Sequence, residues 1–251
     1  MLASLTSDYR LSILSQYFQN NSLKIGHCLM PHDCLLCGIA TGEALICGDC
    51  FAALPHHDQP ACPQCALPTP DGQLCGRCLN NSPAFDRAVA AFDYRYPLAE
   101  VLHNFKYAGQ LALGRFLAET LLERVQHERW PDVLLPMPLH PARLRERGFN
   151  QAAEIAKRAA LATALPLSFD LLAKVRDTAP QASLPWKDRQ ANVKGAFACT
   201  ADITGKRIVL IDDVMTTGAT LNEAAKALKK SGATDVAVWV VARTLPEPEG
   251  R

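Results

Sequence analysis

The sequence lacks long hydrophobic runs and has no excess of charge of one sign. No apolar stretch approaches the roughly 18 residues that a membrane-spanning helix needs, so we expect no membrane insertion. Asp8 and Arg10 lie where a signal peptide needs its apolar stretch. The net charge is only +1, which argues against a surface that binds nucleic acid or membrane over its whole area. We therefore expect a cytoplasmic protein.

Apolar residues are plentiful, since 49% of the 251 residues are hydrophobic and 20% are charged. This composition is typical of globular proteins, and the length suits one large domain or a medium domain with a small one. We predict four segments: an N-terminal extension over 1–33, a cysteine-rich module over 34–86, an α/β domain over 87–245 and a tail over 246–251.

Cysteine is unusually frequent, and eight of the ten cysteines lie in the second segment. They form two copies of one pattern, in which nine residues separate two C-x2-C pairs: Cys34, Cys37, Cys47 and Cys50, then Cys62, Cys65, Cys75 and Cys78. In a reducing compartment such clustering favours a metal over disulfides, and soft thiolates in C-x2-C turns suit tetrahedral zinc. Unliganded thiols or redox pairs are the alternative interpretation.

Two structural zinc ions are the expected content of this double zinc ribbon, because four cysteines on each ion leave no position open for catalysis. The spacing permits sequential or interleaved pairing of the C-x2-C turns. Residues 34–86 carry a net charge of −4, which disfavours phosphate binding and favours a packing or protein-contact module. Residues 1–33 are neutral, so residues 87–251 carry +5 and leave room for a basic groove.

Strand and helix patterns alternate after residue 86. We expect strands at 86–94, 133–139, 206–214 and 235–243, and helices within 97–107, 111–128, 148–165 and 216–232. This alternation predicts a parallel sheet flanked by helices. The stretch from Arg176 to Lys194 is polar, has no clean period and is long for a structureless connection.

The most informative stretch runs from Ile208 to Thr220. Four apolar residues lead to Asp212 and Asp213, and a hydroxyl-rich turn with one glycine then leads into a helix. Backbone amides at such a helix start, with threonine hydroxyls, form a cradle for a phosphate dianion. Adjacent carboxylates repel phosphate but accept hydrogen bonds from sugar hydroxyls. The pattern therefore indicates a ribose 5-phosphate ligand, with a capped helix after a buried strand as the structural alternative.

This stretch resembles the 5-phosphoribosyl 1-diphosphate (PRPP) motif of type I phosphoribosyltransferases. The resemblance implies that Asp212 and Asp213 hold the ribose hydroxyls and act in catalysis, and that the 5-phosphate is wrapped by Met215, Thr216, Thr217, Gly218, Ala219 and Thr220. From Cys34 to about Leu245 the chain resembles the ComF family of competence proteins. The further pieces that match are the cysteine block, Phe105–Tyr107, Pro136–Leu139, Arg143–Gln151 and Gln181–Phe197.

Cationic residues outside the motif supply candidates for the leaving pyrophosphate. We assign Arg143 and Arg147 to it, since planar guanidinium groups suit a diphosphate, with an exposed basic turn as the alternative. Lys106 also reaches phosphate in this interpretation, although a lysine at a helix end can simply extend into solvent. Gln181 and Arg189 lie in a stretch that resembles the mobile catalytic loop of amidophosphoribosyltransferases; a disordered connector is the other interpretation.

The resemblance implies a phosphoribosyltransferase that uses magnesium and PRPP to modify an amine or nitrogen heterocycle, with no covalent protein nucleophile. The residues do not identify the acceptor, and the sequence has no built-in glutaminase pattern. Two other functions stay open. The protein is a non-enzymatic accessory of DNA uptake that binds single-stranded DNA or a helicase partner, or it is a PRPP sensor without turnover.

Overall fold

The computed structural model describes residues 32–42, 44–107, 110–178 and 189–246, with the side chains of residues 32, 189 and 190 left out. The predictions for residues 1–31, for Gln181 and for the end of the tail lie outside this range. Within the described ranges, every helix is too short or too polar to cross a membrane.

A four-stranded parallel sheet forms the centre of the molecule. Its strands are β3 (Arg87–Asp93), β8 (Asp235–Arg243), β7 (Arg207–Met215) and β4 (Val133–Pro136), in that spatial order. β7 begins with a run of Val, Ile and Leu, and β8 is rich in Val and Ala, as expected for strands that are covered on both faces. The predicted parallel α/β architecture is confirmed.

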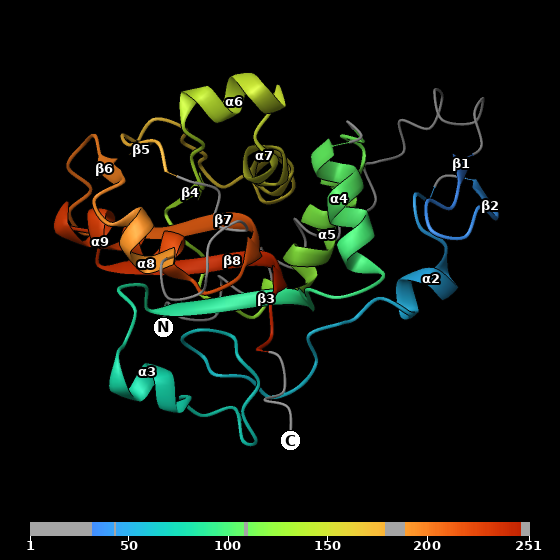
Figure 1. Ribbon diagram of the computed structural model, residues 1–251, viewed down its shortest axis with the longest axis horizontal. Helices are drawn as coiled ribbons and strands as arrows, with labels where there is room; N and C mark the ends of the chain where they lie inside the picture. The colour runs from blue at the N-terminus through green and yellow to red at the C-terminus, as the bar shows by residue number, and fades with distance from the viewer. Residues whose placement is uncertain (1–31, 43, 108–109, 179–188, 247–251) are drawn as a thin grey trace, which may run out of the picture.

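Alternate residues of the strands enter two separate cores. Val209, Ile211 and Trp239 face α4 (Leu98–Tyr107), α5 (Leu113–Val125) and α7 (Gln151–Thr163). Their neighbours Ile208 and Leu210 face α9 (Ala219–Lys230) on the opposite side of the sheet (Figure 1). This two-residue period follows from the pleat of a strand, and it places helices on both faces.

Several short elements were not expected from the sequence. α6 (Pro141–Arg147) occupies the basic run ahead of α7, while β5 (Leu172–Lys174) pairs antiparallel with β6 (Phe197–Cys199), and α8 (Arg189–Val193) lies between them in the chain. The signals for α6 are local ones: proline stands at the first helical position, and Gly148 follows the helix with a φ of 79°.

The cysteine-rich segment covers the outer edge of β3, which would otherwise expose unpaired backbone groups. Its regular elements are β1 (His32–Asp33), β2 (Ala40–Gly42), α2 (Gly48–Ala52) and α3 (Gly76–Asn80). Three backbone bonds hold the edge: Asp93 N–H donates to Pro55 O at 2.8 Å, Ala88 N–H to Pro63 O at 3.1 Å, and His57 N–H to Ala91 O at 3.0 Å. The two cysteine groups thus lie on either side of one edge strand.

Each cysteine group packs against a different core. Cys34 and Leu54 join the core beneath α5, and the Phe51 ring meets Phe116 of α5 edge-on with centroids 5.9 Å apart. The second group forms its own small cluster, and Phe85 behind it joins the core beneath α9. α3 accordingly lies beyond β3 in Figure 1.

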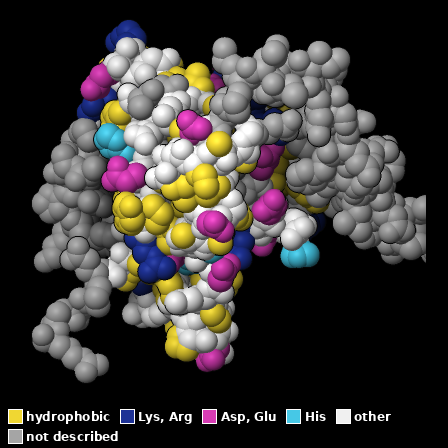
Figure 2. Space-filling view, turned by 90° about the vertical axis from the view of Figure 1, so that its right-hand side faces the viewer, with side chains coloured by type: hydrophobic (Ala, Val, Ile, Leu, Met, Phe, Trp, Pro, Cys, Tyr) yellow, Lys and Arg dark blue, Asp and Glu magenta, His cyan; other side chains and the backbone are white. Residues whose placement is uncertain are grey.

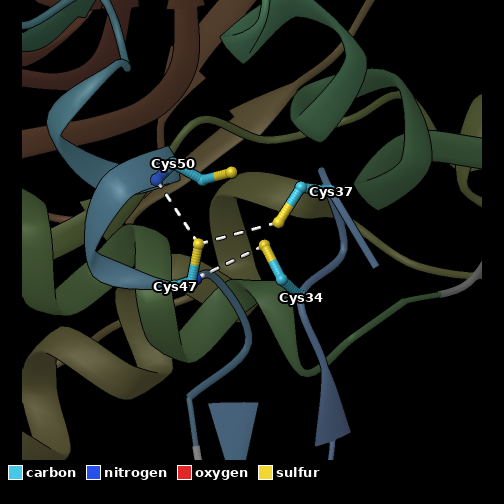
Figure 3. A group of neighbouring side chains, drawn as sticks. All are labelled: Cys34, Cys37, Cys47 and Cys50. Atoms are coloured by element: carbon cyan, nitrogen blue, oxygen red, sulfur yellow. Dashed lines mark hydrogen bonds between the residues drawn. The ribbon is translucent and has the colours of Figure 1, made fainter. Parts of the chain in front are cut away.

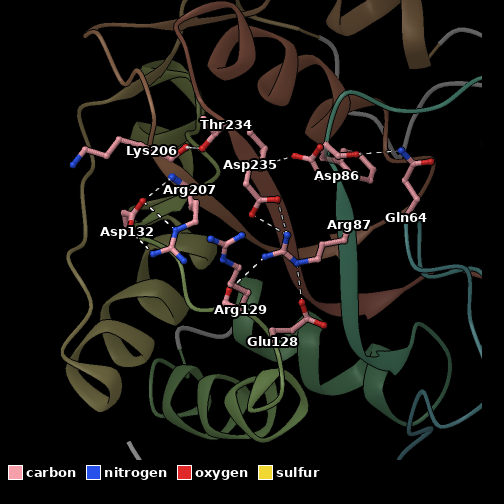
Figure 4. A network of polar contacts seen from close by, with 12 residues as sticks. Gln64, Asp86, Arg87, Glu128, Arg129, Asp132, Lys206, Arg207, Thr234 and Asp235 are labelled. Carbon is pink, nitrogen blue, oxygen red and sulfur yellow. Dashed lines mark hydrogen bonds and ion pairs between the residues drawn. The ribbon is translucent and has the colours of Figure 1, made fainter. Parts of the chain in front are cut away.

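Ion pairs link the starts of the parallel strands in two pairs, β3 with β8 and β4 with β7 (Figure 4). Arg87 donates to Asp235 at 2.7 Å and to Glu128 at 2.8 Å, which links β3 to β8. Asp132, next to β4, accepts from Arg207 of β7 at 2.6 Å and also from the Arg207 backbone N–H at 2.9 Å. The guanidinium and backbone N–H of Arg207 lower the pKa of Asp132 to about 2.

We predict that Asp132→Asn lowers the free energy of unfolding by about 1 kcal/mol, the size expected for a charged pair whose side chains are about a third exposed. Because the pKa of Asp132 is lower in the folded state, its stabilisation is complete above about pH 4 and is lost as the pH falls to about 2. Urea midpoints should therefore differ between the two proteins at pH 7 and converge below pH 4.

The control is Asp58→Asn, which removes the partner of Arg124 from a pair whose carboxylate side chain is 72% exposed. We expect a change below about 0.5 kcal/mol at every pH. Equal effects of the two substitutions at pH 7 would contradict the importance of the Asp132–Arg207 pair.

Candidate functional site

The carboxyl ends of the parallel strands meet at one edge of the sheet. Met215 of β7 pairs with Arg243 of β8, which in turn pairs with Asp93 of β3. A cavity of about 480 Å³ opens at this edge. Its lining includes Asp212, Asp213, Lys106, Arg147 and most of the predicted phosphate loop. Open α/β sheets bind ligands at this place.

Asp213 forms an ion pair across the cavity wall. Its Oδ2 lies 2.6 Å from Nζ of Lys106, and its Oδ1 accepts the Val214 N–H at 2.7 Å. Asp212 Oδ1 accepts the Asp213 N–H at 2.9 Å. Within the described ranges, no Lys or Arg forms an ion pair with Asp212. The two adjacent carboxylates therefore have different electrostatic surroundings.

These surroundings separate the two carboxylates by pKa. Burial, and then the negative charge of Asp213, raise the pKa of Asp212 well above its ordinary value. Burial also opposes ionisation of Asp213, but the Lys106 ammonium outweighs it and lowers the pKa of Asp213. Lys106 itself keeps its proton, because Asp213 raises its pKa against the effect of burial. Asp213 is thus ionised and paired, whereas Asp212 favours the proton in the absence of a further cation.

The turn from Met215 to Gly218 has its carbonyl groups bound on the side away from the carboxylates. Arg243 donates to the carbonyls of Met215, at 2.9 Å, and of Thr216, and Arg77 donates to the carbonyl of Thr217. In a trans peptide the C=O and N–H groups point in opposite directions. The N–H groups of Thr216, Thr217 and Gly218, which follow these carbonyls, are therefore directed away from the arginines, and Thr216 and Gly218 line the cavity.

The same turn starts α9. Gly218, at the N-cap position of α9, has a φ of 79°, a conformation that suits glycine. Because glycine has no side chain, this position supplies no side-chain cap for the first N–H groups of the helix. Thr217 is buried, and its Oγ1 accepts the Ala219 N–H at 3.1 Å. The positive end of the α9 dipole lies at the cavity, where Thr216, Gly218, Ala219 and Thr220 all contribute to the lining. Thr217 instead lies behind the loop.

The predicted pyrophosphate residues fall in different places. Lys106 and Arg147 line the cavity, and Arg147 lies 5.9 Å from the centroid of the Tyr107 ring. Arg143, one helical turn earlier in α6, pairs with Glu146 at 2.8 Å and is not among the lining residues. The structure therefore brings two of the three cations to the site and leaves Arg143 beside it.

Lys174 is a cation near the site that the sequence analysis missed. It lies half-buried on β5; burial lowers its pKa, and the nearby positive charges of Arg143 and Arg176 act in the same direction. The charges of Asp177 and Asp212 oppose this shift. No motif marks Lys174, because its approach to Asp212 depends on how the β5–β6 pair folds over the sheet.

The predicted mobile loop is described only in part. Gln181 lies outside the described residues, and Arg189 begins α8, with its side chain also outside them. α8 contacts α9, whose first turn is at the cavity. A role for Gln181 and Arg189 in closing the site stays a prediction.

The cysteines form two separate groups of four, in the sequential pairing. In each group the four sulfur atoms lie within 4.8 Å of one another (Figure 3 shows the first). Cys37 Sγ is 3.7 Å from Cys47 Sγ, and Cys65 Sγ is 3.6 Å from Cys75 Sγ. A zinc tetrahedron with Zn–S bonds of about 2.3 Å has S–S edges of about 3.8 Å, so both groups fit structural zinc.

Backbone amides also point at the first group of sulfurs. The Cys47 N–H donates to Cys34 Sγ at 3.4 Å, and the Cys50 N–H donates to Cys47 Sγ at 3.4 Å. Such donors stabilise the thiolate, which is the form that binds metal. The geometry of the four sulfurs and of these amides supports a closed, structural site.

Comparison with known families divides the chain in agreement with this geometry. Residues 144–249 match the phosphoribosyl transferase domain family, and residues 25–79 match the double zinc ribbon domain family. The protein thus has a phosphoribosyltransferase-like α/β domain and an N-terminal double zinc ribbon.

The chain aligns with its relatives over most of its length. It is 35% identical to the DNA utilization protein YhgH of Shigella flexneri, over 86% of this chain and 99% of that protein. It is 32% identical to competence protein F of Haemophilus influenzae, over 78% of this chain and 84% of that protein. Competence protein ComFC of Streptococcus pneumoniae is 27% identical, over 84% of this chain and 99% of that one. The chain belongs to the ComF family.

We predict opposite effects of two isosteric substitutions on the ligand-free protein. Asp212→Asn should raise the melting temperature at pH 7 by about 2–4 °C, the shift that about 1 kcal/mol produces in a chain of this size, because the folded state no longer buries an unpaired carboxylate. The gain should shrink as the pH is lowered and should vanish below about pH 4, where the carboxyl becomes protonated in the unfolded state as well. Thermal unfolding at several pH values measures it.

Asp213→Asn is the matched comparison. It leaves Lys106 charged and without its partner, so we expect the protein to lose about 1–3 kcal/mol and to melt at a lower temperature. If both substitutions lowered the melting temperature equally, the electrostatic difference between the two carboxylates would be wrong.

Proposed function

We propose that the protein binds PRPP with magnesium and transfers its phosphoribosyl group to a nitrogen acceptor. One observation carries this proposal: the two carboxylates and the start of α9 line the same cavity and are separated in the chain by a single short loop. Carboxylates accept hydrogen bonds from ribose hydroxyls, and the helix start binds a phosphate. A phosphorylated pentose matches both requirements at once.

The chain's own groups would bind this ligand in a defined orientation. Loop N–H groups from Thr216 to Gly218 and the hydroxyl of Thr220 would receive the 5-phosphate, while Asp212 accepts hydrogen bonds from the ribose. Lys106 holds Asp213 in place and adds positive charge to the same wall. Arg147, which lines the same cavity, would then be available to the diphosphate of the ligand.

Magnesium fits the oxygen donors and the charge of this site. The aspartate pair has one paired and one unpaired carboxylate, and hard divalent cations prefer oxygen ligands such as these together with phosphate. A bound magnesium ion would neutralise charge on the diphosphate. The raised pKa of Asp212 indicates the same need, because ionisation of this carboxyl is favoured only when a cation approaches.

The proposed reaction is a displacement at the anomeric carbon. The bond from that carbon to the pyrophosphate oxygen breaks, a bond to the acceptor nitrogen forms, and the acceptor nitrogen releases a proton. Arg147 and Lys106 stabilise the departing negative charge by their position at the cavity, and no covalent protein nucleophile is required. The acceptor is an amine or a nitrogen heterocycle.

We predict that PRPP with magnesium raises the melting temperature of the wild-type protein and that Asp212→Asn with Asp213→Asn abolishes this rise. Glu100→Gln on the exposed face of α4 is the control and should keep it. Turnover is tested by pyrophosphate release from PRPP with a panel of amines and nucleobases. A shift without release from any acceptor would support a PRPP sensor and overturn the transfer step. Indifference to millimolar PRPP would overturn the proposal.

The names of the relatives refer to competence and DNA utilization, and they favour a second function. Binding of single-stranded DNA, or of a helicase partner, by the basic residues 87–251 would suit such a role. The zinc ribbons are poorer candidates, because residues 34–86 carry a net charge of −4. Figure 2, the view from the right-hand side of Figure 1, shows Asp and Glu side chains scattered over the described part of that face.

If this second function is right, single-stranded DNA should bind with an affinity that falls steeply with salt and that survives substitution of both aspartates by asparagine. Fluorescence anisotropy of a labelled oligonucleotide at several salt concentrations measures it. Loss of DNA binding in the double variant would tie DNA to the PRPP cavity instead, and no binding at low salt would exclude direct DNA contact.

A further inference from the structure

The second cysteine group touches the back of the phosphate loop through two arginines. Arg77 lies within the C-x2-C turn between Cys75 and Cys78, and its guanidinium donates to the carbonyl of Thr217. Arg243, at the end of β8, donates through Nε to the Cys65 carbonyl at 2.8 Å. Both arginines line a cavity of about 190 Å³ between this cysteine group and the loop.

Arg243 is the central link. Its side chain is almost wholly buried, with 1% of the residue exposed, and it bonds only to carbonyl oxygens: those of Cys65, Met215, Thr216 and Thr244. In the described part of the chain, no carboxylate forms an ion pair with it. A buried guanidinium requires a compensating negative charge.

The second zinc centre has the required charge. Four thiolates and one Zn²⁺ carry a net charge of −2, and the cysteine group lies directly beyond the Cys65 carbonyl that Arg243 binds. The same charge favours the approach of Arg77 to Arg243, two cations that would otherwise repel each other. The first cysteine group lies on the opposite side of β3 and packs against α5, away from the loop.

We propose that Arg77 and Arg243 are positioning residues that couple the second zinc centre to the phosphate loop, so that zinc at this centre, and not at the first, determines how tightly the loop binds a phosphate dianion. The arginines hold three successive carbonyls and thereby turn the following N–H groups toward the cavity. This proposal rests on the proposed function, because the phosphate is that of PRPP.

The experiment compares four full-length proteins: wild type, Arg77→Gln, Cys75→Ser and Cys37→Ser. Zinc per chain is measured by mass spectrometry and the affinity for PRPP with magnesium by calorimetry. Hydrogen exchange is followed at the amides of Asn222 and Thr244, which donate to the loop carbonyls of Gly218 and Met215. The exchange rates report on loop order without any ligand.

We expect two zinc ions in wild type and in Arg77→Gln, and one in each cysteine variant. Cys75→Ser should weaken PRPP binding and speed the exchange by about tenfold or more. Arg77→Gln should do so by about fivefold to tenfold, since it removes one charged hydrogen bond. Cys37→Ser, the matched control at the first centre, should stay within about twofold of wild type in both measurements.

Two outcomes would overturn the coupling. One is an Arg77→Gln protein with wild-type affinity and exchange, a test that holds even if Cys75→Ser fails to fold, because Arg77 is exposed and its replacement opens no hole in the core. The other is equal loosening of the loop by Cys37→Ser and Cys75→Ser. A wild type that does not bind PRPP would overturn the proposed function alone, since hydrogen exchange still tests the coupling.

Discussion

The direction of three peptide groups between β7 and α9 is the constraint on which the candidate site depends. A turn at the end of a parallel strand can present either carbonyls or amides to the ligand. Here Arg243 and Arg77 bind the carbonyls of Met215, Thr216 and Thr217 from behind, so the amides remain for the cavity. Asp212 and Asp213 line the same cavity as this loop.

The zinc ribbons have a structural role in the α/β domain. They cover the edge of β3 by backbone hydrogen bonds, and they extend both cores of the α/β domain. Small cysteine-rich segments bury too little apolar surface to fold without a metal or another staple. Zinc therefore stabilises a cover that the sheet needs, and the second ribbon also reaches the back of the phosphate loop.

The two adjacent carboxylates of the cavity wall differ in their electrostatic surroundings. Lys106 compensates Asp213, whereas Asp212 has no cation of its own among the described residues and favours its proton. The buried Asp212 carboxyl, which has no cation beside it, destabilises the folded state. A cation that accompanies PRPP would remove this destabilisation. Strained or poorly compensated groups of this kind concentrate at functional sites, where the ligand supplies what the fold omits.

Residue types and short spacings were enough to predict the order of the main elements and the candidate sites. Apolar runs predicted β7 and β8, the paired aspartates and the threonine-rich turn predicted one site, and the duplicated C-x2-C pattern predicted two groups of four cysteines. These features depend only on residue type and short spacing, so the sequence is enough to predict them. The short helix α6 also has local signals, in Pro141 and Gly148, but the basic run between them was interpreted as a pyrophosphate-binding turn.

Which distant residues meet depends on how the chain packs in three dimensions. The Lys106–Asp213 ion pair and the hydrogen bonds of Arg77 and Arg243 to the loop join residues far apart in the chain. Such contacts follow from strand order and from the packing of helices on the sheet, and no spacing along the chain encodes them. That is why Arg143 and Arg147, alike in sequence, end in different surroundings.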